Sequence, residues 1–458
     1  MLRNPNHILL CVTSSVSASF FEGQAGYLQR QGWTISLTAS ADLPGQLERF
    51  EQTEAISVHP FPLGRDISLW ADAKAFVRAV RLFRKLRPTI SNVGTPKAGL
   101  VMGLAAAATA VPIRIYTLHG LRLATTTGPK RRVLAIAEKI AMAAAHTVVC
   151  VSPSLREQVI KLGLAKPDKV VVNGAGSING VTIPPLEATP RPRSTSEPII
   201  GFVGRLTRDK GVEDLVVAFA LLTQVIPAAR LWLIGRNDQT DPLSPETLAA
   251  IAADSRITTT GMVDDVWSYY EQMTVLALPS YREGLPSVLL EGAAHALPTV
   301  ATNATGCRDG FIPGRTGWEV SPGQPGELAE ALLACLSDQD EAGDRGRAGR
   351  AWVSTNFSRQ TVWEHWNHFY HDAVATRFGA GGTSMKHSVG ITSDAGAITL
   401  GGLPDVLGGL PDVLTSPAVR RHISQGATNG TDRVHDRDGR SIAANLQVER
   451  REGGNSVA

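Results

Sequence analysis

Several features that would assign a protein to a class at once are scarce or missing in this sequence. Cysteine is rare: only Cys11, Cys150, Cys307 and Cys335 occur in 458 residues, and none lies in a Cys-x-x-Cys pair. Scattered in this way, they indicate reduced, buried side chains of a cytosolic protein, not a disulfide framework or a zinc site. Long apolar runs are also missing. The most apolar stretch, 101–111, is rich in alanine and far shorter than the ~20 residues of a membrane-spanning helix, so it predicts a buried helix.

An excess of one charge and a secretion signal are lacking as well. The 45 Lys and Arg residues nearly balance the 42 Asp and Glu residues, for a formal net charge of +3, so no nucleic-acid partner is expected. The apolar run at 8–12 is too short for the core of a secretory signal. No Gly-x-Gly-x-x-Gly follows it, which disfavours a Rossmann dehydrogenase. We expect a protein that is soluble or bound peripherally to a membrane.

What is present is an alternation of apolar runs with helical patterns, in two blocks. In the first block the expected strands are 8–12, 33–37, 89–93, 113–117 and 147–151, and the expected helices are 20–31, 97–110 and 130–145, with a serine-rich loop at 13–19. The second block has expected strands at 199–203, 229–234, 275–278 and 298–301 and helices at 211–224 and 286–296. Such alternation predicts α/β domains, each with a parallel sheet covered by helices on both faces. Ligands bind beyond the carboxyl ends of such strands, so a cleft between two domains is the expected site.

Composition marks the boundaries between these parts. A stretch rich in proline interrupts the alternation after the first block, and a stretch rich in Gly, Ser and Thr follows the second. The tail carries Gly-Gly-Leu-Pro-Asp-Val-Leu twice in tandem, at 401–407 and 408–414, and has too little apolar surface to fold alone; a short-motif partner site is the alternative. The expected parts are a first domain at 1–184, a linker at 185–198, a second domain at 199–358, a helix at 359–378 that packs back towards the first domain, and the tail at 379–458.

Cations gather where the first strand of the second block ends. The segment 201–211 reads Gly-Phe-Val-Gly-Arg-Leu-Thr-Arg-Asp-Lys-Gly, so Arg205 and Lys210 lie between an apolar strand and the expected start of a helix. Arg can fork onto phosphate oxygens, Lys supplies a point charge, and the N-terminus of a helix adds to both. The segment therefore predicts an anion site. Two solvated surface cations are the alternative.

Two acids lie eight residues apart later in the second block, in Glu283-Gly-Leu-Pro-Ser-Val-Leu-Leu-Glu291. Pro286 suits the start of a helix, where its missing N–H costs nothing. Carboxylates accept two or more hydrogen bonds, so both acids could bind sugar hydroxyls. The alternatives are a helix-capping role for Glu283 and an exposed helix position for Glu291, although apolar neighbours disfavour a solvated face for Glu291.

The two motifs together resemble those of glycosyltransferase family 4, a large group of retaining enzymes with the GT-B fold. Gly-Arg-x4-Lys-Gly and Glu-x7-Glu occur in this order, about 80 residues apart. The resemblance covers about residues 6–378 and implies two Rossmann-like parallel-sheet domains that face each other across a cleft. Four more segments resemble the branch that builds bacterial capsule, exopolysaccharide and O-antigen units: 94–100, 117–120, 149–155 and 301–309.

The resemblance implies a role for each matched residue. Arg205 and Lys210 would hold the diphosphate of a nucleotide diphosphate sugar and stabilise the charge of the leaving nucleotide. Glu283 would contact the donor sugar, and Glu291 would bind the ribose hydroxyls. His119, in Thr-Leu-His-Gly, would touch the donor sugar or phosphate from the first domain; a structural histidine is the alternative. Further donor contacts would come from Gly204, Val263, Gly284, Leu285, Pro286, Ser287 and Val288.

The acceptor side is the least explicit part of the sequence. Many members of the family carry Gly-Gly in the first strand-to-helix loop, where this chain has a loop rich in serine and phenylalanine. Ser14, Ser15 and Gln24 are hypotheses for this side. No metal and no cofactor are expected, because the family retains the anomeric configuration by front-face attack, with the donor phosphate accepting the proton. The pairs Asp264-Asp265 and Asp238-x-x-Asp241 are interpreted as solvated or capping acids in loops, because a metal site would need further ligands that the sequence does not identify.

A basic helix is expected at 68–87. Its apolar stripe is Leu69, Ala73, Phe76, Val80 and Phe83, and its cations are Lys74, Arg78, Arg81, Arg84, Lys85 and Arg87, with Lys130, Arg131 and Arg132 further on. Basic amphipathic surfaces bind anionic lipid with about 1 kcal/mol per cation. The alternative is an ordinary helix with a solvated basic side. Because the resembled branch commonly acts on polyprenyl-diphosphate-linked sugars, the resemblance implies a peripheral enzyme at the cytoplasmic face of the cell membrane with a lipid-linked glycan acceptor.

The expected activity is transfer of a hexose or N-acetylhexosamine from a nucleotide sugar, preferably UDP-linked, to a polysaccharide precursor. Two alternatives stay open at this point. One is a GT-B nucleotide-sugar epimerase, which the Gly-Arg-x4-Lys-Gly motif disfavours. The other is a non-catalytic paralogue that binds a nucleotide sugar or a membrane.

Overall fold

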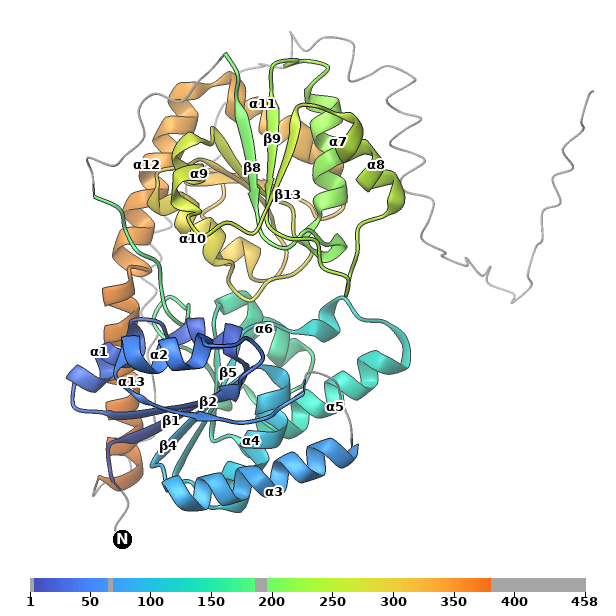
Figure 1. Ribbon diagram of the computed structural model, residues 1–458. Helices are drawn as coiled ribbons and strands as arrows, with labels where there is room; N and C mark the ends of the chain where they lie inside the picture. Colours follow the sequence, from blue (N-terminus) through green and yellow to red (C-terminus); the bar gives the residue numbers. More distant parts are fainter. Residues whose placement is uncertain (1–3, 65–68, 186–195, 380–458) are drawn as a thin grey trace, which may run out of the picture. The chain divides into compact units, whose positions relative to one another are not determined.

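The computed structural model describes residues 4–64, 69–185 and 196–379 (Figure 1). Residues 186–195 of the expected linker and residues 380–458 of the expected tail lie outside the described residues. The described residues form two parallel sheets, one in each block, so the expected α/β fold with two Rossmann-like units is confirmed.

The first sheet has seven strands in the order β3-β2-β1-β4-β5-β6-β7, and every neighbouring pair is parallel. The order reverses between β1 and β4, which is the switch point where ligands of such sheets bind. The strands are β1 His7–Ser14, β2 Thr34–Ser40, β3 Ser57–Pro60, β4 Ile90–Gly94, β5 Ile113–Leu118, β6 Thr147–Cys150 and β7 Val170–Val172.

The second sheet has six parallel strands in the order β10-β9-β8-β11-β12-β13, and its order reverses between β8 and β11. The predicted Arg205 and Glu283 follow these two central strands. The strands are β8 Ile199–Val203, β9 Arg230–Ile234, β10 Ile257–Gly261, β11 Val275–Leu278, β12 Thr299–Thr302 and β13 Gly317–Val320.

Helices join successive strands in both sheets. Those of the first block are α1 Gln24–Arg30, α2 Gln46–Glu54, α3 Leu69–Leu86, α4 Pro96–Ala108, α5 Gly128–Ala144 and α6 Pro153–Lys161, with 3-10 helices η1 Ser15–Phe21, η2 Arg122–Ala124 and η3 Pro167–Lys169. Those of the second are α7 Val212–Leu222, α8 Pro245–Ala253, α9 Trp267–Gln272, α10 Ser287–Ala294, α11 Pro325–Ser337, α12 Gln339–Asn356 and α13 Arg359–Phe378, with η5 Arg208–Lys210 and η6 Cys307–Asp309.

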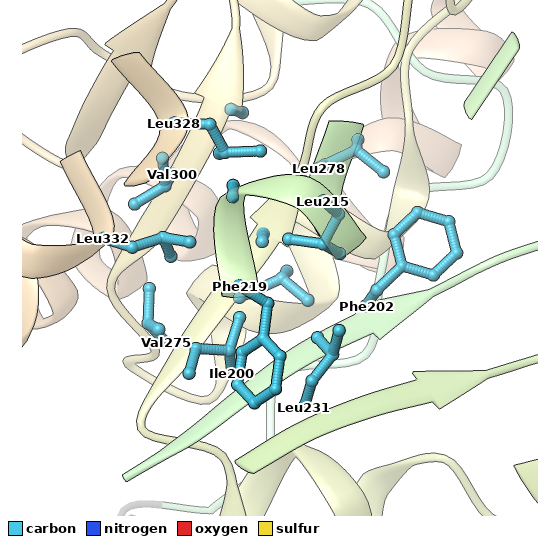
Figure 2. Packing of buried hydrophobic residues seen from close by; sticks show 14 of the residues in the cluster. Ile200, Phe202, Leu215, Phe219, Leu231, Val275, Leu278, Val300, Leu328 and Leu332 are labelled. Atoms are coloured by element: carbon cyan, nitrogen blue, oxygen red, sulfur yellow. The ribbon is translucent and has the colours of Figure 1, made fainter. Parts of the chain in front are cut away.

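The apolar run of β1 shows why both faces of the first sheet are covered. Side chains alternate between the two faces of a strand. Ile8 and Leu10 pack in one cluster with residues of α1, whereas Leu9 and Cys11 pack in another with residues of α3 and α4. A strand buried on both sides is apolar throughout, as this run is. The second sheet has an equivalent core, in which Phe202 of β8 and Phe219 of α7 contribute large aromatic side chains (Figure 2).

The helix α13 belongs to the end of the described chain but packs in the core of the first sheet. Trp366 and Tyr370 are fully buried in the cluster that contains Ile8 and Leu10 of β1. The hydroxyl of Tyr370 accepts a hydrogen bond from Asn92 of β4, at 2.7 Å. The first sheet is therefore completed by residues more than 350 positions away from its first strand.

Two local predictions were wrong. The stretch 15–21 is a 3-10 helix instead of a loop, and the following helix begins at Gln24 instead of residue 20, because Gly23 adopts φ +75° and separates the two. In α3 the predicted stripe is confirmed at Phe83, which is buried, and at Phe76 and Val80, which pack against the same cluster. It is wrong at Ala73, which is exposed, while Ala75 and Ala79 are buried. Small alanine side chains let the helix lie close to its neighbour α4. The side chain of Leu69 lies outside the described part.

The surface of α3 is strongly basic. The five predicted cations of α3 are exposed, and so is Arg87, which follows it. Trp70 (84% exposed) and Val77 (48%) are exposed on the same helix. Within the described ranges, no helix is both long enough and apolar enough to cross a bilayer.

Candidate active site

Arg205 lies in the turn that follows β8, and its charge has a partner. Its Nη1 is 2.6 Å from Oδ2 of Asp238, and the arginine side chain is 45% exposed. Asp238 also accepts hydrogen bonds from the amide and hydroxyl of Thr240. The Thr240 amide and Arg205 hold the pKa of Asp238 well below its usual range. Asp238 is thus a permanent anion in front of the predicted phosphate-binding arginine.

Lys210 and Glu283 come from different strand-to-helix turns and meet at the same edge of the sheet. Lys210 Nζ lies 2.5 Å from Glu283 Oε1, and both side chains are mostly buried. Gly211 follows Lys210 with φ +69° and is the N-cap residue of α7; a Cβ at this position would strike the carbonyl of Pro279. Glycine is therefore required where the Lys210 turn passes the end of β11. The structure brings two of the predicted donor-site residues into direct contact.

The turn after β11 fits between two other backbones. The amide of Glu283 donates to the carbonyl of Thr305 at 2.8 Å. A Cβ on Gly284 would collide with the carbonyl oxygen of His119, from the first domain. A Cβ on Gly306 would lie 2.6 Å from the carbonyl carbon of Glu283. These close approaches place the His119 segment directly against the Glu283 turn.

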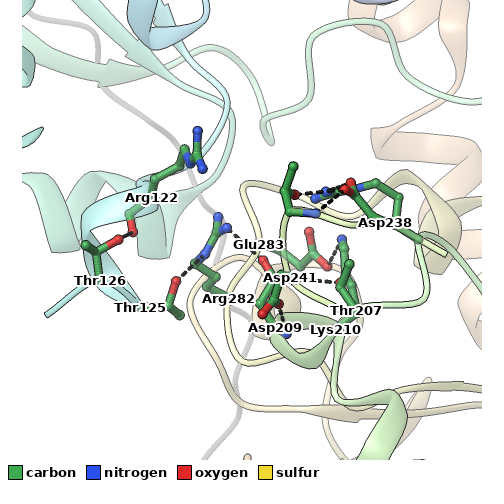
Figure 3. A network of polar contacts seen from close by, with 12 residues as sticks. Arg122, Thr125, Thr126, Thr207, Asp209, Lys210, Asp238, Asp241, Arg282 and Glu283 are labelled. Atoms are coloured by element: carbon green, nitrogen blue, oxygen red, sulfur yellow. Dashed lines mark hydrogen bonds and ion pairs between the residues drawn. The ribbon is translucent and has the colours of Figure 1, made fainter. Parts of the chain in front are cut away.

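Arg282 was missed by the sequence reasoning. It donates through Nη2 to Asp209 Oδ2 and through Nε to Thr125 Oγ1, each at 2.7 Å (Figure 3). Asp209 precedes Lys210, so Arg282 connects the turn that carries Glu283 to the turn that carries Lys210. Through Thr125, Arg282 also connects the second domain to the first. The only signal in the sequence was a cation next to Glu283, with no spacing to set it apart.

Glu291 lies on α10, which begins after Pro286 at its N-cap. Its Oε2 accepts a hydrogen bond from the hydroxyl of Tyr270 at 2.8 Å. Tyr270 was also missed, because a buried tyrosine on an apolar helix face has no distinguishing pattern. The other predicted donor contacts differ in burial. Gly284 and Pro286 are buried, Ser287 is exposed, and the remaining four are half-buried: Gly204, Val263, Leu285 and Val288.

His119 follows β5 and stacks on Phe20, with ring centroids 4.5 Å apart. Its Nε2 is buried and has no hydrogen-bond partner among the described residues. Burial lowers the pKa of His119 to about 4, so the imidazole is neutral near pH 7. A neutral ring has one donor and one acceptor nitrogen, which suits a contact with a sugar hydroxyl.

The three acceptor-side candidates each have a local structural role. Ser14 accepts from the amide of Ser17 and caps η1. Ser15 donates to Asp42 from its amide and its hydroxyl. Gln24 is buried and donates to the carbonyl of Ile178.

The acid pairs have ordinary loop partners. Asp265 accepts from the amide of Trp267 at 3.0 Å, and Asp241 accepts from the amide of Asp209 at 2.8 Å. Asp264 is exposed. Over residues 4–64, 69–185 and 196–379, no group of three or more His, Cys, Asp or Glu side chains is arranged to hold a metal ion.

Comparison with known proteins agrees with this arrangement. Residues 197–338 match the family model "Glycosyl transferases group 1", and residues 17–176 match "Glycosyl transferase 4-like domain". The capsular polysaccharide biosynthesis glycosyltransferase CapM of Staphylococcus aureus is 33% identical over 366 residues, which are 78% of this chain and 95% of CapM.

Solved structures share the fold at lower identity. The Anabaena protein HepE, solved with UDP and glucose, superposes with a TM-score of 0.65 at 18% identity and covers 80% of this chain and 99% of its own. Sucrose-phosphate synthase of Thermosynechococcus elongatus superposes with a TM-score of 0.67 at 20% identity, over 81% of this chain and 100% of its own.

Two Rossmann-like parallel sheets, with the Lys210 and Glu283 turns meeting at one edge of the second, define a glycosyltransferase of the GT-B fold. The matches over both blocks go one step further. The chain belongs to glycosyltransferase family 4 and is similar to the branch of that family that contains CapM.

Proposed function

We propose that this enzyme moves a hexose or N-acetylhexosamine from a UDP sugar, with retention of configuration, to a polyprenyl-diphosphate-linked precursor of a capsular or related polysaccharide. The observation that carries the proposal is the contact between Lys210 and Glu283, 2.5 Å apart on adjacent turns. A cation and an acid at one point of the sheet edge suit a donor with a phosphate beside a sugar. The name of CapM supports a role in capsular polysaccharide biosynthesis, and the structure of HepE with UDP and glucose supports a UDP-linked donor.

The donor would enter by exchanging ion pairs. The diphosphate takes the place of Asp238 at Arg205 and of Glu283 at Lys210, and the N-terminus of α7 adds its dipole. Glu283, released from Lys210, accepts hydrogen bonds from the donor sugar. Glu291 accepts from the ribose hydroxyls, the backbone near Val263 meets the base, and the turn 284–288 faces sugar and phosphate.

Transfer then proceeds on one face of the sugar. The acceptor hydroxyl oxygen forms a bond to the anomeric carbon while the bond from that carbon to the phosphate oxygen breaks. The proton of the acceptor passes to a donor phosphate oxygen. Arg205 and Lys210 offset the negative charge that grows on the leaving diphosphate. His119 is neutral, so it forms a hydrogen bond with the sugar and adds no charge to the site. In this proposal no metal ion is needed for leaving-group stabilisation.

The first domain would rest on the cytoplasmic face of the membrane. Cations of α3 lie beside the exposed Trp70 and Val77, and α5 exposes Val133 (51%), Ile136 (58%) and Ile140 (40%) at helical spacing, next to Lys130, Arg131, Arg132 and Lys139. Such surfaces combine attraction to anionic headgroups with shallow apolar insertion. A lipid-linked acceptor would then reach the site without leaving the bilayer.

The donor side is tested by a panel of UDP-glucose, UDP-galactose, UDP-N-acetylglucosamine and GDP-mannose, with a lipid extract containing polyprenyl-diphosphate sugars as acceptor. We expect nucleotide release and a retained anomeric configuration with a UDP sugar. Glu283→Gln should lower kcat by about 100- to 1,000-fold, whereas the control Glu319→Gln, at an exposed position of β13, should leave it unchanged. An inverted product, or use of GDP-mannose alone, would contradict the proposal.

The membrane side is tested with vesicles of phosphatidylglycerol. Removing two cations, in Arg78→Gln with Arg81→Gln, should weaken binding about 30-fold, at about 1 kcal/mol per cation. The matched control removes two exposed arginines of the second domain, Arg315 and Arg347, and should bind like the wild type. Equal binding by all three proteins would exclude α3 as the membrane surface.

A further inference from the structure

Tyr270 lies directly behind the acid that is proposed to bind ribose. It belongs to α9, and its side chain is fully buried, with 0% exposed. Its hydroxyl donates to Oε2 of Glu291 at 2.8 Å. In the described part of the chain, no hydrogen bond reaches Oε1 of Glu291. One oxygen of the carboxylate is therefore held from inside the protein, and the other is left for a ligand.

Aromatic rings pack around Tyr270. The ring of Tyr270 packs against His295, with centroids 5.3 Å apart, and Trp267 packs edge-on against His295 at 5.2 Å. The Nδ1 of His295 lies 2.8 Å from the carbonyl oxygen of Glu291. The same small cluster thus fixes both the tyrosine ring and the helix turn that carries the acid.

The hydroxyl is a donor under all physiological conditions. Burial raises the pKa of Tyr270 well above its ordinary value, and the nearby Glu291 adds to the shift. A carboxylate that accepts one hydrogen bond at Oε2 keeps a lone pair there and both lone pairs at Oε1. With Oε2 held, the carboxylate plane cannot rotate freely, so the remaining lone pairs point in set directions.

We propose that Tyr270 is a positioning residue that aims the carboxylate of Glu291 at the ribose hydroxyls, and so makes the enzyme prefer ribonucleotides to their 2′-deoxy counterparts. The inference rests on the proposed function, in which Glu291 binds ribose. Tyr270 does not itself touch the donor. Asp265 accepts from the amide of Trp267, which connects the start of α9 to the segment of Val263, the proposed base contact. The proposed base contact and the residue that positions the ribose contact thus lie on one continuous stretch of chain.

The test measures calorimetric affinity for UDP and 2′-deoxy-UDP in the full-length enzyme, with GDP and 2′-deoxy-GDP as a second pair. Tyr270→Phe removes only the hydroxyl and keeps the ring in the core. It should weaken binding of the ribonucleotide about tenfold and binding of the deoxy form less than twofold. In turnover, the donor KM should rise by the same factor while kcat changes less than twofold.

A matched control and a second variant separate positioning from stability. Tyr370→Phe removes a hydroxyl that is equally buried but bonded to Asn92 in the first domain, and it should leave both affinities unchanged. Tyr270→Met removes the hydroxyl but fills the place of the ring with a flexible apolar side chain, and it should lose the preference for ribose as Tyr270→Phe does. This variant decides the matter if Tyr270→Phe fails to fold.

Two failures have different meanings. If Glu291→Gln removes the ribose preference but Tyr270→Phe and Tyr270→Met retain it, the positioning role is overturned and the proposed donor site stands. If Glu291→Gln itself leaves the ribose preference intact, Glu291 does not bind ribose, and this part of the proposed function fails together with the inference. Equal weakening of both nucleotides by Tyr270→Phe also overturns the positioning role.

Discussion

At the scale of single residues, the candidate site is held in place by pairs of opposite charge. Arg205 faces Asp238, Lys210 faces Glu283, and Arg282 faces Asp209. Each of these three cations already has an anion as its partner. Binding of a donor must therefore replace internal contacts, and its affinity depends on how much those contacts stabilise the free enzyme.

The pair of Arg205 and Asp238 gives the first prediction. Because the arginine is 45% exposed, the pair contributes little, on the order of 0–1 kcal/mol. Asp238→Asn should release Arg205 and lower the donor KM by up to about fivefold, with kcat unchanged. Steady-state kinetics against the donor checks this. Asp254→Asn, which breaks the comparable pair with Arg256, is the control and should have no effect. A higher KM would mean that Asp238 orients Arg205 for the donor and does not compete with the donor for it.

At the scale of elements, hydrogen bonds between the short helices α6 and η6 join the two domains; this contact is called the clasp below. Ser154, near the start of α6, donates from its amide at 3.1 Å and from its hydroxyl to Oδ2 of Asp309 in η6. The same hydroxyl accepts from the amide of Gly306 at 2.7 Å. Asp309 thus caps the positive end of a helix of the other domain. Because Gly306 packs on the backbone of Glu283, the clasp supports the Glu283 turn.

Breaking this clasp should slow sugar transfer more than it weakens nucleotide binding. Ser154→Ala removes hydrogen bonds to a charged group, worth about 1.5–3 kcal/mol, so kcat/KM for the acceptor should fall at least tenfold. The affinity for UDP, measured by calorimetry, should change less than threefold, since the predicted nucleotide contacts lie in the second domain. Arg308→Ala, which removes the exposed neighbouring pair with Glu157, should cost less than twofold. A wild-type rate for Ser154→Ala would exclude the clasp.

The helix α5 contains a buried acid that makes stability depend on pH. Glu138 is 5% exposed and accepts a hydrogen bond from Tyr116 at 2.9 Å. Burial raises the pKa of Glu138 from 4.5 to about 7. The folded state therefore holds a proton that the unfolded state has lost between these values, so the stabilising effect is complete below pH 4.5 and is lost as the pH rises through 7.

Glu138→Gln should remove that pH dependence. The wild type should lose up to roughly 3 kcal/mol of unfolding free energy from this group between pH 4.5 and 7. Urea unfolding of both proteins from pH 5 to 8 measures the difference, which should grow in favour of the variant as the pH rises. A constant difference between the two proteins would contradict a protonated Glu138.

At the scale of the whole molecule, the first domain is completed by the last described helix. Trp366 of α13 is fully buried among the strands of the first sheet. Trp366→Ala should lower the free energy of unfolding by about 3–5 kcal/mol through the cavity it leaves. Trp70→Ala, at an 84% exposed position, should change it by less than about 0.5 kcal/mol. Thermal and urea unfolding check both values; a small effect of Trp366→Ala would mean that α13 is dispensable for the first domain.

The sequence by itself determined the two α/β blocks and the positions of Arg205, Lys210, Glu283 and Glu291. Both kinds of information are local: alternating burial sets strands and helices, and short spacings place charged groups at strand ends. It misplaced the start of α1 and missed Ala75 and Ala79 in the buried face of α3, because a single Gly23 and the close approach of α4 decided them.

Only the tertiary structure decided the partners of these residues. Arg282 with Thr125, Tyr270 with Glu291, Ser154 with Asp309, and Trp366 with β1 join positions separated by 21 to more than 350 residues. The physical reason is that a periodic pattern indicates which positions along an element are buried. It does not indicate which side chain from another element packs beside each of them. That choice is made when the sheets and helices pack, because burial leaves each polar group only the partners within hydrogen-bonding distance.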